Sequence, residues 1–254
     1  MKRAEKAYKN VEFLNSQEAR TLRILAEYLE PKKRFDKENI KHTIVFFGSS
    51  RAKSDPCDDP SGFDSSKYYW AAEEFAFKLA SWSKELEKQG CGFVICSGGG
   101  PGIMEAANRG ANRANAKSIG LNISIPFEQT PNDYISLQLN FEFHYFFMRK
   151  LWFLYHAKAL IVFPGGFGTM DELLETLTLV QTHKLPKTNI PILLYDQTFW
   201  EKIINFKKLA EYHLISPGDL KLFHYFSTPD QGMEYLKPRL LKIIKDFNNN
   251  NRSL

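Results

Sequence analysis

Hydrophobic positions in this chain follow two alternating patterns along most of its length. Short runs rich in apolar residues are typical of parallel strands that are buried on both faces. Longer segments with apolar residues at helical spacing lie between these runs and predict helices. This alternation predicts an α/β fold with a doubly wound parallel sheet and helices on both faces. The predicted strands are Thr43–Phe47, Phe93–Cys96, Ser118–Ile123, Ala159–Phe163 and Ile190–Tyr195, and the helices between them include Trp70–Gln89, Ile103–Ala111 and Thr169–Thr182.

The rest of the pattern is less regular. Residues 52–66 are polar and contain Pro, Asp, Ser and Gly, so they predict a loop. The sequence contains no internal repeat and predicts no second domain. Four further elements are expected: an extended stretch at Leu139–Tyr145 and helices at Phe147–His156, about Phe199–Tyr212 and about Pro229–Phe247.

The first forty residues predict a helical extension ahead of the main domain. Leu22, Leu25 and Leu29 recur at helical spacing, and Pro31 is expected to end the helix. We expect this segment to cover the main domain or a partner subunit. The chain therefore divides into a helical extension at 1–40, a single α/β domain at 41–247 and a frayed tail at 248–254.

Composition is compatible with this single large domain. The chain has 254 residues, of which 43% are hydrophobic and 25% charged, so it can bury a full core. The net charge is +5 and the sequence pI is about 8.9, but the basic residues are dispersed rather than gathered in one tract. This dispersion indicates a solvated surface and predicts no nucleic-acid partner.

Apolar stretches, the N-terminus and the cysteines indicate the cellular compartment in which the protein is expected. No apolar stretch approaches the roughly 18 residues of a membrane span, so no membrane partner is expected. The segment Met1–Lys6 is charged and lacks the apolar core of a signal peptide. The three cysteines, Cys57, Cys91 and Cys96, form no C-x-x-C pair. These features favour the reduced cytoplasm.

Three glycine or serine turns follow predicted strands. They are Gly48–Arg51, Gly98–Gly102 and Pro164–Thr169. Ligands of open α/β sheets bind at the carboxyl ends of the strands, where the strand order reverses. The third turn leads into a helix whose free N–H groups and positive dipole end favour a phosphate. Glu172 adds a carboxylate one helical turn further on, which indicates chemistry on a phosphorylated small molecule.

Several common sites are disfavoured by the spacing. The run Gly98-x-Gly100-x-Gly102 differs from the dinucleotide fingerprint G-x-G-x-x-G, and no acidic residue follows about 20 positions on. No Lys follows the glycines as in a Walker motif, and no G-x-S-x-G elbow is present. The six histidines show no H-x-x-x-H pairing, so no metal site is predicted. A monophosphate remains the favoured ligand.

The motifs together resemble the Lonely Guy (LOG) family. Ser97–Glu105 reads S-G-G-G-P-G-I-M-E, Met148-Arg149-Lys150 follows, and Pro164–Glu172 reads P-G-G-F-G-T-M-D-E. The resemblance covers about Thr43 to Tyr195, and the residues after the triple glycine match the longer bacterial type. It implies a Rossmann-like nucleotide-binding domain at 41–247 that works as a homo-oligomer, a dimer or larger.

The resemblance also implies an activity. Members of the family are nucleoside 5′-monophosphate phosphoribohydrolases, which cut the N-glycosidic bond of AMP-like or cytokinin nucleotides to release a base and ribose 5-phosphate. No cofactor is implied. Although many members are labelled lysine decarboxylases, nothing in the sequence indicates the Schiff-base Lys that a PLP enzyme needs. The alternative is a non-catalytic carrier that binds a nucleotide or a pterin cofactor in the same cradle.

Residue roles follow from the matched motifs. Glu172 and Arg149 match the catalytic pair of the family. The carboxylate would hold the ribose hydroxyls, stabilise a cationic ribose or activate water, and the guanidinium would orient the nucleotide or assist departure of the base. Substrate binding is expected of ten more residues. Of these, Ser49 either contacts the nucleotide or caps a helix, and Lys150 either contacts the substrate or faces solvent. The ten are Ser49, Gly98, Gly99, Gly100, Met148, Lys150, Gly165, Gly166, Gly168 and Thr169.

Overall fold

A computed structural model describes residues 3–56, 63–87, 91–125, 130–185 and 190–250. Within these residues, seven parallel strands form one sheet in the order β4-β3-β2-β1-β5-β6-β7. The doubly wound α/β fold predicted from the sequence is therefore confirmed. The strands are β1 (Thr43–Phe47), β2 (Val94–Ser97), β3 (Ser118–Ile123), β4 (Asn140–Phe143), β5 (Ala157–Val162), β6 (Ile192–Tyr195) and β7 (His224–Phe226).

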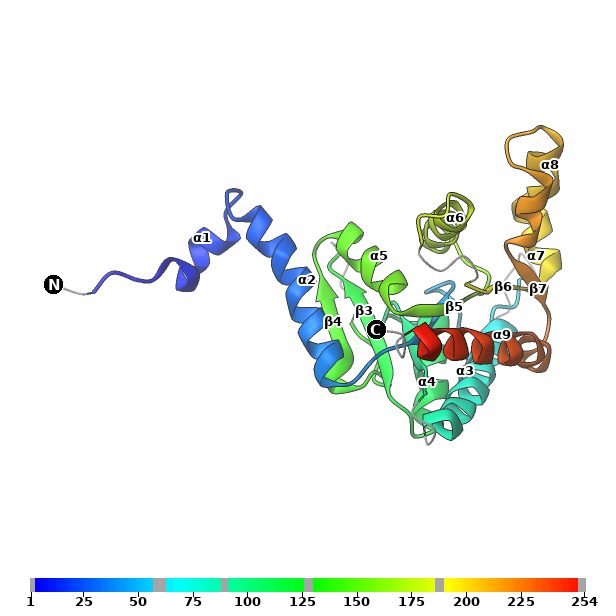
Figure 1. Ribbon diagram of the computed structural model, residues 1–254, viewed down its shortest axis with the longest axis horizontal. Helices are drawn as coiled ribbons and strands as arrows, with labels where there is room; N and C mark the ends of the chain where they lie inside the picture. The colour runs from blue at the N-terminus through cyan, green and yellow to red at the C-terminus, as the bar shows by residue number, and fades with distance from the viewer. Residues whose placement is uncertain (1–2, 57–62, 88–90, 126–129, 186–189, 251–254) are drawn as a thin grey trace.

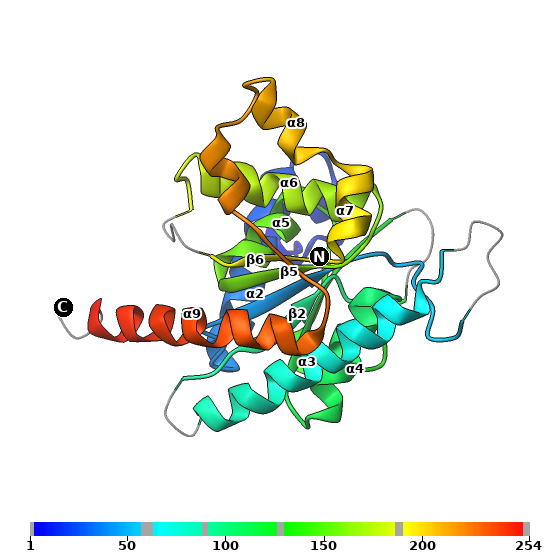
Figure 2. The same ribbon diagram turned by 90° about the vertical axis from the view of Figure 1, so that its right-hand side faces the viewer.

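Helices cover both faces of the sheet, and Figure 2 shows the two layers. One layer contains α3, α4 and α9, and the other contains α5, α6, α7 and α8. The helices are α1 (Val11–Asn15), α2 (Arg20–Lys37), α3 (Ser66–Glu87), α4 (Ile103–Arg113), α5 (Phe146–Tyr155), α6 (Phe167–Gln181), α7 (Gln197–Ile203), α8 (Phe206–Glu211) and α9 (Pro229–Asn250), with short 3-10 turns at Ala7–Lys9, Leu137–Leu139 and Pro217–Lys221.

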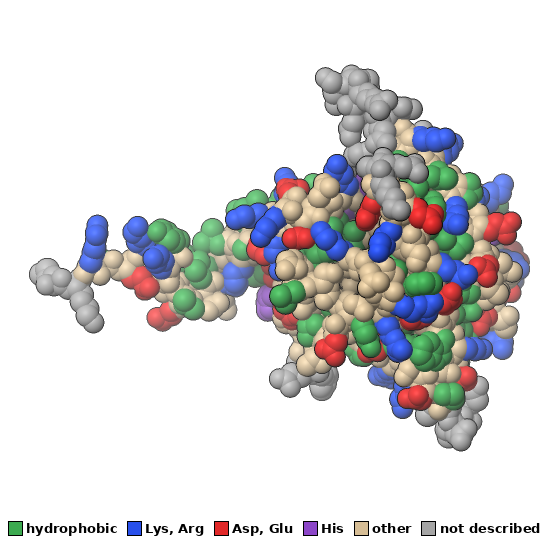
Figure 3. Space-filling model, turned by 90° about the horizontal axis from the view of Figure 1, so that it is seen from below, with side chains coloured by type: hydrophobic (Ala, Val, Ile, Leu, Met, Phe, Trp, Pro, Cys, Tyr) green, Lys and Arg blue, Asp and Glu red, His purple; other side chains and the backbone are tan. Residues whose placement is uncertain are grey.

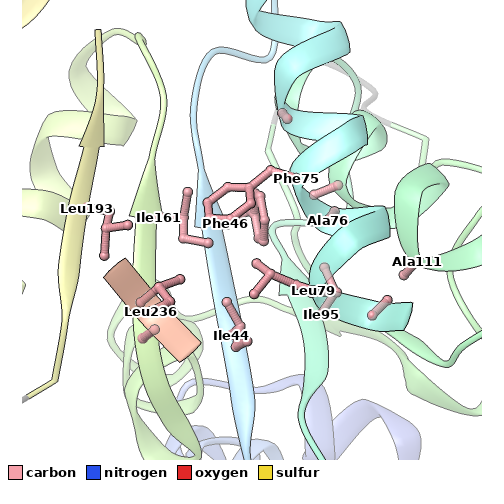
Figure 4. Close-up of a cluster of buried hydrophobic side chains, with 14 of the residues drawn as sticks. Ile44, Phe46, Phe75, Ala76, Leu79, Ile95, Ala111, Ile161, Leu193 and Leu236 are labelled. Atoms are coloured by element: carbon pink, nitrogen blue, oxygen red, sulfur yellow. The ribbon is translucent and has the colours of Figure 1, made fainter. Parts of the chain in front are cut away.

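The central strand β1 shows why these runs are apolar throughout. All five of its residues are buried, because side chains alternate between two covered faces. Ile44 and Phe46 pack in the cluster beneath α3 and α9 (Figure 4), whereas Val45 and Phe47 pack in the cluster beneath α5 and α6. The sheet thus separates two hydrophobic cores.

The N-terminal part projects from this body. Figure 1 shows α1 and the start of α2 extending away from the sheet. Figure 3, the view from below, shows the same projection with apolar and charged side chains exposed along it, and basic and acidic side chains interspersed over the body. None of the described helices combines the length and the apolar character that a bilayer span requires.

The prediction that Pro31 ends the first helix is wrong. Helix α2 continues through Pro31 to Lys37. Proline lacks the N–H that would bond to the carbonyl of Glu27 four residues earlier. The indole Nε1–H of Trp152 donates to that carbonyl instead, at 2.9 Å, so the cost of the missing bond is offset by a contact from α5.

Further differences from the expected elements concern α7 and α8, the C-terminal tail and β7, whereas other helix and strand ends shift by one to four residues. The single helix expected at Phe199–Tyr212 is two helices, because Asn205 caps α8 by accepting from the N–H of Lys208. Helix α9 extends to Asn250, so the tail expected to fray from 248 is helical for its first three residues, and the remainder lies outside the described residues. The short strand β7 was not predicted.

Candidate active site

The strand order reverses between β1 and β5, and the loops after these two strands are joined there. The N–H of Phe163 donates to the Phe47 carbonyl at 2.8 Å, and the N–H of Ser49 donates to the Pro164 carbonyl at 3.0 Å. The N–H of Ile103 at the start of α4 donates to the Ser49 carbonyl at 3.0 Å. The three glycine turns predicted from the sequence therefore meet at one edge of the sheet.

A cavity of about 640 Å³ opens at this edge. Its lining comes from the end of β1 and the loop after it, the turn after β2, the first turn of α4, the end of β3, helix α5 and the first turns of α6. Among the described residues that line it are Phe47, Gly48, Ser49, Ser50, Arg51, Gly98, Met104, Ile123, Phe146, Arg149, Phe153, Gly166, Phe167, Gly168, Thr169, Met170, Asp171 and Glu172.

The three glycines around the start of α6 differ in what a side chain would meet there. A Cβ on Gly165 would lie 2.1 Å from Oγ1 of Thr169, so this glycine is required by packing. A Cβ on Gly166 or Gly168 would meet no atom within 4 Å, and neither residue has a positive φ. Packing and backbone strain therefore do not account for these two glycines. The open space lies at the first turn of α6, where backbone N–H groups have no intrahelical acceptor and favour an anion.

Glu172 lies one turn inside α6 and is only 9% exposed. Burial raises the pKa of its carboxyl to about 7, although the positive charges of Arg149 and Lys150 act to lower it. No hydrogen bond joins this carboxylate to another described side chain, while the Glu172 carbonyl accepts from Oγ1 of Thr176 at 2.7 Å. A buried carboxyl that titrates near neutrality and lines a cavity is typical of a catalytic acid or base.

Arg149 is held rigidly beside this carboxyl. Its Nε donates to the Leu121 carbonyl at 2.7 Å, and its guanidinium lies 5.1 Å from the ring centre of Phe153. Desolvation lowers the pKa of Arg149, and the charge of Glu172 opposes that shift. A Cβ on Gly98 would lie 2.4 Å from Nη2 of Arg149, so Gly98 makes room for the guanidinium. The cavity therefore contains a guanidinium held in place by a hydrogen bond and a carboxyl whose pKa is about 7.

Seven of the predicted site residues line the cavity: Ser49, Gly98, Arg149, Gly166, Gly168, Thr169 and Glu172. The other five lie beside it.

Met148 is buried in the hydrophobic cluster under α5. The Lys150 ammonium forms ion pairs with Asp171 at 2.8 Å and with Glu175 at 3.1 Å, which connects α5 to α6.

The remaining three are glycines. Gly99 has a φ of +76°, and its carbonyl accepts from the backbone N–H and the Nδ2 of Asn132, so its geometry serves the turn after β2. Gly100 and Gly165 also lie outside the lining. A direct substrate contact for these residues stays a prediction.

Eleven of the lining residues are not among the predicted site residues, and three of them could contact a ligand at the open side of the cavity: Arg51, Phe146 and Phe167. Arg51 ends the turn after β1, and Phe167 occupies the variable position of P-G-G-x-G-T, so both are next to motif residues in the sequence. Phe146 is the first residue of α5, three positions before Arg149. Nothing in the hydrophobic pattern distinguishes these rings from core aromatics. Among the described residues, no cluster of His, Cys, Asp or Glu is arranged to hold a metal ion.

Fold and site together define an α/β protein with a cavity at the strand-order reversal, lined by the N-terminus of a helix, a partly buried arginine and a buried glutamate. A sequence model of one family, described as "Possible lysine decarboxylase", matches residues 104–236. The chain belongs to this family, the LOG family.

Characterised relatives agree with that assignment. The chain is 27% identical over 186 residues to cytokinin riboside 5′-monophosphate phosphoribohydrolase LOG3 of Arabidopsis thaliana, which covers 71% of this chain and 74% of the relative. It is 29% identical over 151 residues to the pyrimidine/purine nucleotide 5′-monophosphate nucleosidase of Escherichia coli K12, over 55% of this chain and 32% of that protein.

Solved structures show the same fold. The protein TM1055 superposes with a TM-score of 0.53 at 18% identity, over 78% of this chain and 99% of that one. The molybdenum cofactor carrier protein of Chlamydomonas reinhardtii superposes with a TM-score of 0.52 at 20% identity, over 79% of this chain and 99% of the carrier. At these identities the likeness concerns the fold alone.

Proposed function

We propose that the protein hydrolyses the N-glycosidic bond of nucleoside 5′-monophosphates, AMP-like or cytokinin riboside monophosphates, to a free base and ribose 5-phosphate. The observation that carries this proposal is that the buried carboxyl of Glu172 and the partly buried guanidinium of Arg149 line one cavity together with the first turn of α6. The names of the relatives, a phosphoribohydrolase and a nucleotide 5′-monophosphate nucleosidase, support the same reaction.

The first turn of α6 would hold the 5′-phosphate. Gly166 and Gly168 leave room for close approach, and the N–H groups and positive dipole of the helix favour the anion. The hydroxyl of Thr169, which lines the cavity, adds a donor. Binding at this point fixes the ribose relative to Glu172, and such positioning can lower a barrier by several kcal/mol.

The proposed bond cleavage uses the side chains of Glu172 and Arg149. As the bond between C1′ and the base nitrogen breaks, its electron pair stays with the base and the ribose becomes cationic. The ionised Glu172 stabilises that cation and takes a proton from the water whose oxygen bonds to C1′. The Arg149 guanidinium hydrogen-bonds the departing base, which then takes a proton from solvent. Electrostatic stabilisation of this kind is strong where water is excluded.

Incubation with AMP, followed by chromatography, tests the proposal directly. The wild type should release adenine and ribose 5-phosphate in equal amounts, and Glu172→Gln should reduce the rate at least a hundredfold. Glu175→Gln is the matched control, since Glu175 lies on the same helix but outside the cavity lining. A bound pterin in native mass spectrometry, without base release from any monophosphate, would establish the carrier alternative instead.

The family label suggests a lysine decarboxylase, which needs a Lys that forms a Schiff base with PLP. The cavity residues do not fit this cofactor. The lysine nearest to the pair in the sequence, Lys150, is engaged by Asp171 and Glu175, and the described lining contains no lysine. We therefore derive no step through PLP.

We also propose that the protein acts as a homo-oligomer in which the extension at 1–40 covers a partner subunit. Leu22, Leu25 and Leu29 form an exposed stripe on α2. On another face of the same helix, Tyr28 stacks on Trp152 and Phe35 contacts it at a tilt. Light scattering of the full chain should give at least a dimer mass, and Leu25→Glu should reduce it. Location in the cytoplasm stays a prediction.

A further inference from the structure

Two phenylalanine rings lie at the mouth of the cavity. Phe167, the first residue of α6, is 92% exposed, more than any other large apolar side chain of the described residues. Phe146, the first residue of α5, is 53% exposed. Both line the cavity that holds Arg149 and Glu172. A ring left in water forgoes the burial of a large apolar surface, so two such rings at one opening require an explanation.

Residues of α5 line the cavity from its buried end to its open end. Phe146, Arg149 and Phe153 are spaced i, i+3 and i+7, which places them on one helix face, and all three line the cavity. Exposure rises along this face from 1% at Phe153 to 53% at Phe146. The guanidinium therefore lies between a closed apolar end and an open aromatic end.

The start of α6 also presents an exposed aromatic ring to the cavity. Phe167 lies between Gly166 and Gly168 in the sequence, and a Cβ at either glycine would meet no atom within 4 Å. The neighbouring acid, Asp171, is bonded to Lys150. Phe167 is thus an unobstructed ring directly beside the anion cradle.

We propose that Phe146 and Phe167 form an aromatic clamp that stacks the base of the bound nucleotide. This inference rests on the proposed function, in which the base is the leaving group and must depart through the mouth. Aromatic rings stack on every base, since every base has a π-face. Stacking also grows with overlapping area, so the clamp favours purine over pyrimidine monophosphates without reading the edges of the base.

Calorimetric titration in a Glu172→Gln background, which blocks turnover, tests the clamp. The probes are AMP, CMP and ribose 5-phosphate. Phe167→Ala should weaken AMP binding about tenfold, weaken CMP binding less, and leave the Kd of ribose 5-phosphate within about twofold. Phe146→Ala should act in the same direction, and Phe167→Trp should restore AMP binding. Leu137→Ala is the control, because Leu137 is 82% exposed but lies outside the cavity lining.

Equal losses for AMP and ribose 5-phosphate, or no loss for either, would overturn the clamp. So would a changed oligomeric mass of Phe167→Ala with the preference for AMP over ribose 5-phosphate intact, because the ring would then serve a subunit contact. The results distinguish a failure of the proposed hydrolysis from a failure of the proposed clamp. Base-dependent binding without adenine release contradicts hydrolysis alone, and wild-type turnover with unchanged AMP affinity in Phe167→Ala contradicts the clamp alone.

Discussion

At the scale of single residues, Glu172 has the clearest physical signature in the chain. Burial raises the pKa of this carboxyl from its ordinary 4.5 to about 7. The folded protein therefore binds a proton more tightly at this position than the unfolded chain does. Stability from this group is fully present below about pH 4.5 and is lost as the pH rises through about 7. A buried carboxyl of this kind destabilises the fold at the pH where it is ionised.

Substitution of Glu172 should remove the loss of stability that its ionisation causes. Glu172→Gln stays neutral at every pH, so relative to the wild type its free energy of unfolding should improve by on the order of 2 kcal/mol between pH 5 and pH 8. Urea unfolding at the two values measures the difference. Glu175→Gln instead removes an ion pair with Lys150, so it should show no such gain. Equal stability changes for Glu172→Gln at both pH values would contradict the buried, shifted carboxyl.

Replacing Gly98 or Gly166 with alanine should change different kinetic constants. In Gly98→Ala the new Cβ conflicts with the ends of the Arg149 and Met104 side chains, which can move, so the fold should survive with Arg149 displaced. A displacement of about 1 Å is enough to lower kcat about a hundredfold. In Gly166→Ala the Cβ meets no protein atom and enters the cradle, so KM should rise with less effect on kcat. Steady-state kinetics with AMP distinguishes these effects, and identical changes in both variants would contradict the two assignments.

At the scale of elements, α2 holds the start of α5, the helix that carries Arg149. The carboxylate of Glu27 accepts from the N–H groups of His144 at 2.8 Å and Tyr145 at 3.3 Å, immediately before α5 begins. The Glu27 carbonyl, left without a partner by Pro31, accepts from Trp152 on α5. Helix α2 therefore fixes both the beginning and the middle of the helix that carries Arg149.

Glu27→Ala should lower the free energy of unfolding by about 1 kcal/mol, because two backbone donors lose their acceptor. Urea unfolding measures the loss. Glu30→Ala, on the same helix, removes only an exposed ion pair with Arg34 and should cost a few tenths of a kcal/mol. Equal losses in the two variants would mean that Glu27 does not hold the start of α5.

The elements differ in how far the sequence reveals them. The strands around β1 were predictable, since burial on both faces makes them apolar throughout. The continuation of α2 past Pro31 was not, because it depends on Trp152, which lies 121 positions further along the chain. The division between α7 and α8 depends on one Asn cap, and β7 is only three residues long. Local pattern fails where a distant contact or a single cap decides the boundary.

At the scale of the whole molecule, the strand order assembles the site. The chain adds β2, β3 and β4 on one side of β1 and β5, β6 and β7 on the other, so the turns after β1 and β5 become neighbours. This placement follows from general rules for parallel sheets, which is why the motif residues could be assigned to one edge from the sequence. The roles of Phe146 and Phe167 could not be assigned, because their exposure depends on how α5 and α6 meet around the cavity.

The rate of adenine release from AMP as a function of pH, in the wild type and in Glu172→Gln, tests the central claim most directly. If the ionised Glu172 acts on the ribose, kcat/KM of the wild type should rise with pH through a midpoint near 7, which is the pKa of the buried carboxyl. Glu172→Gln should be at least a hundredfold slower throughout, with this rise absent. A wild type that releases no adenine, or a variant that retains the wild-type rate and pH profile, would contradict N-glycosidic hydrolysis by this pair.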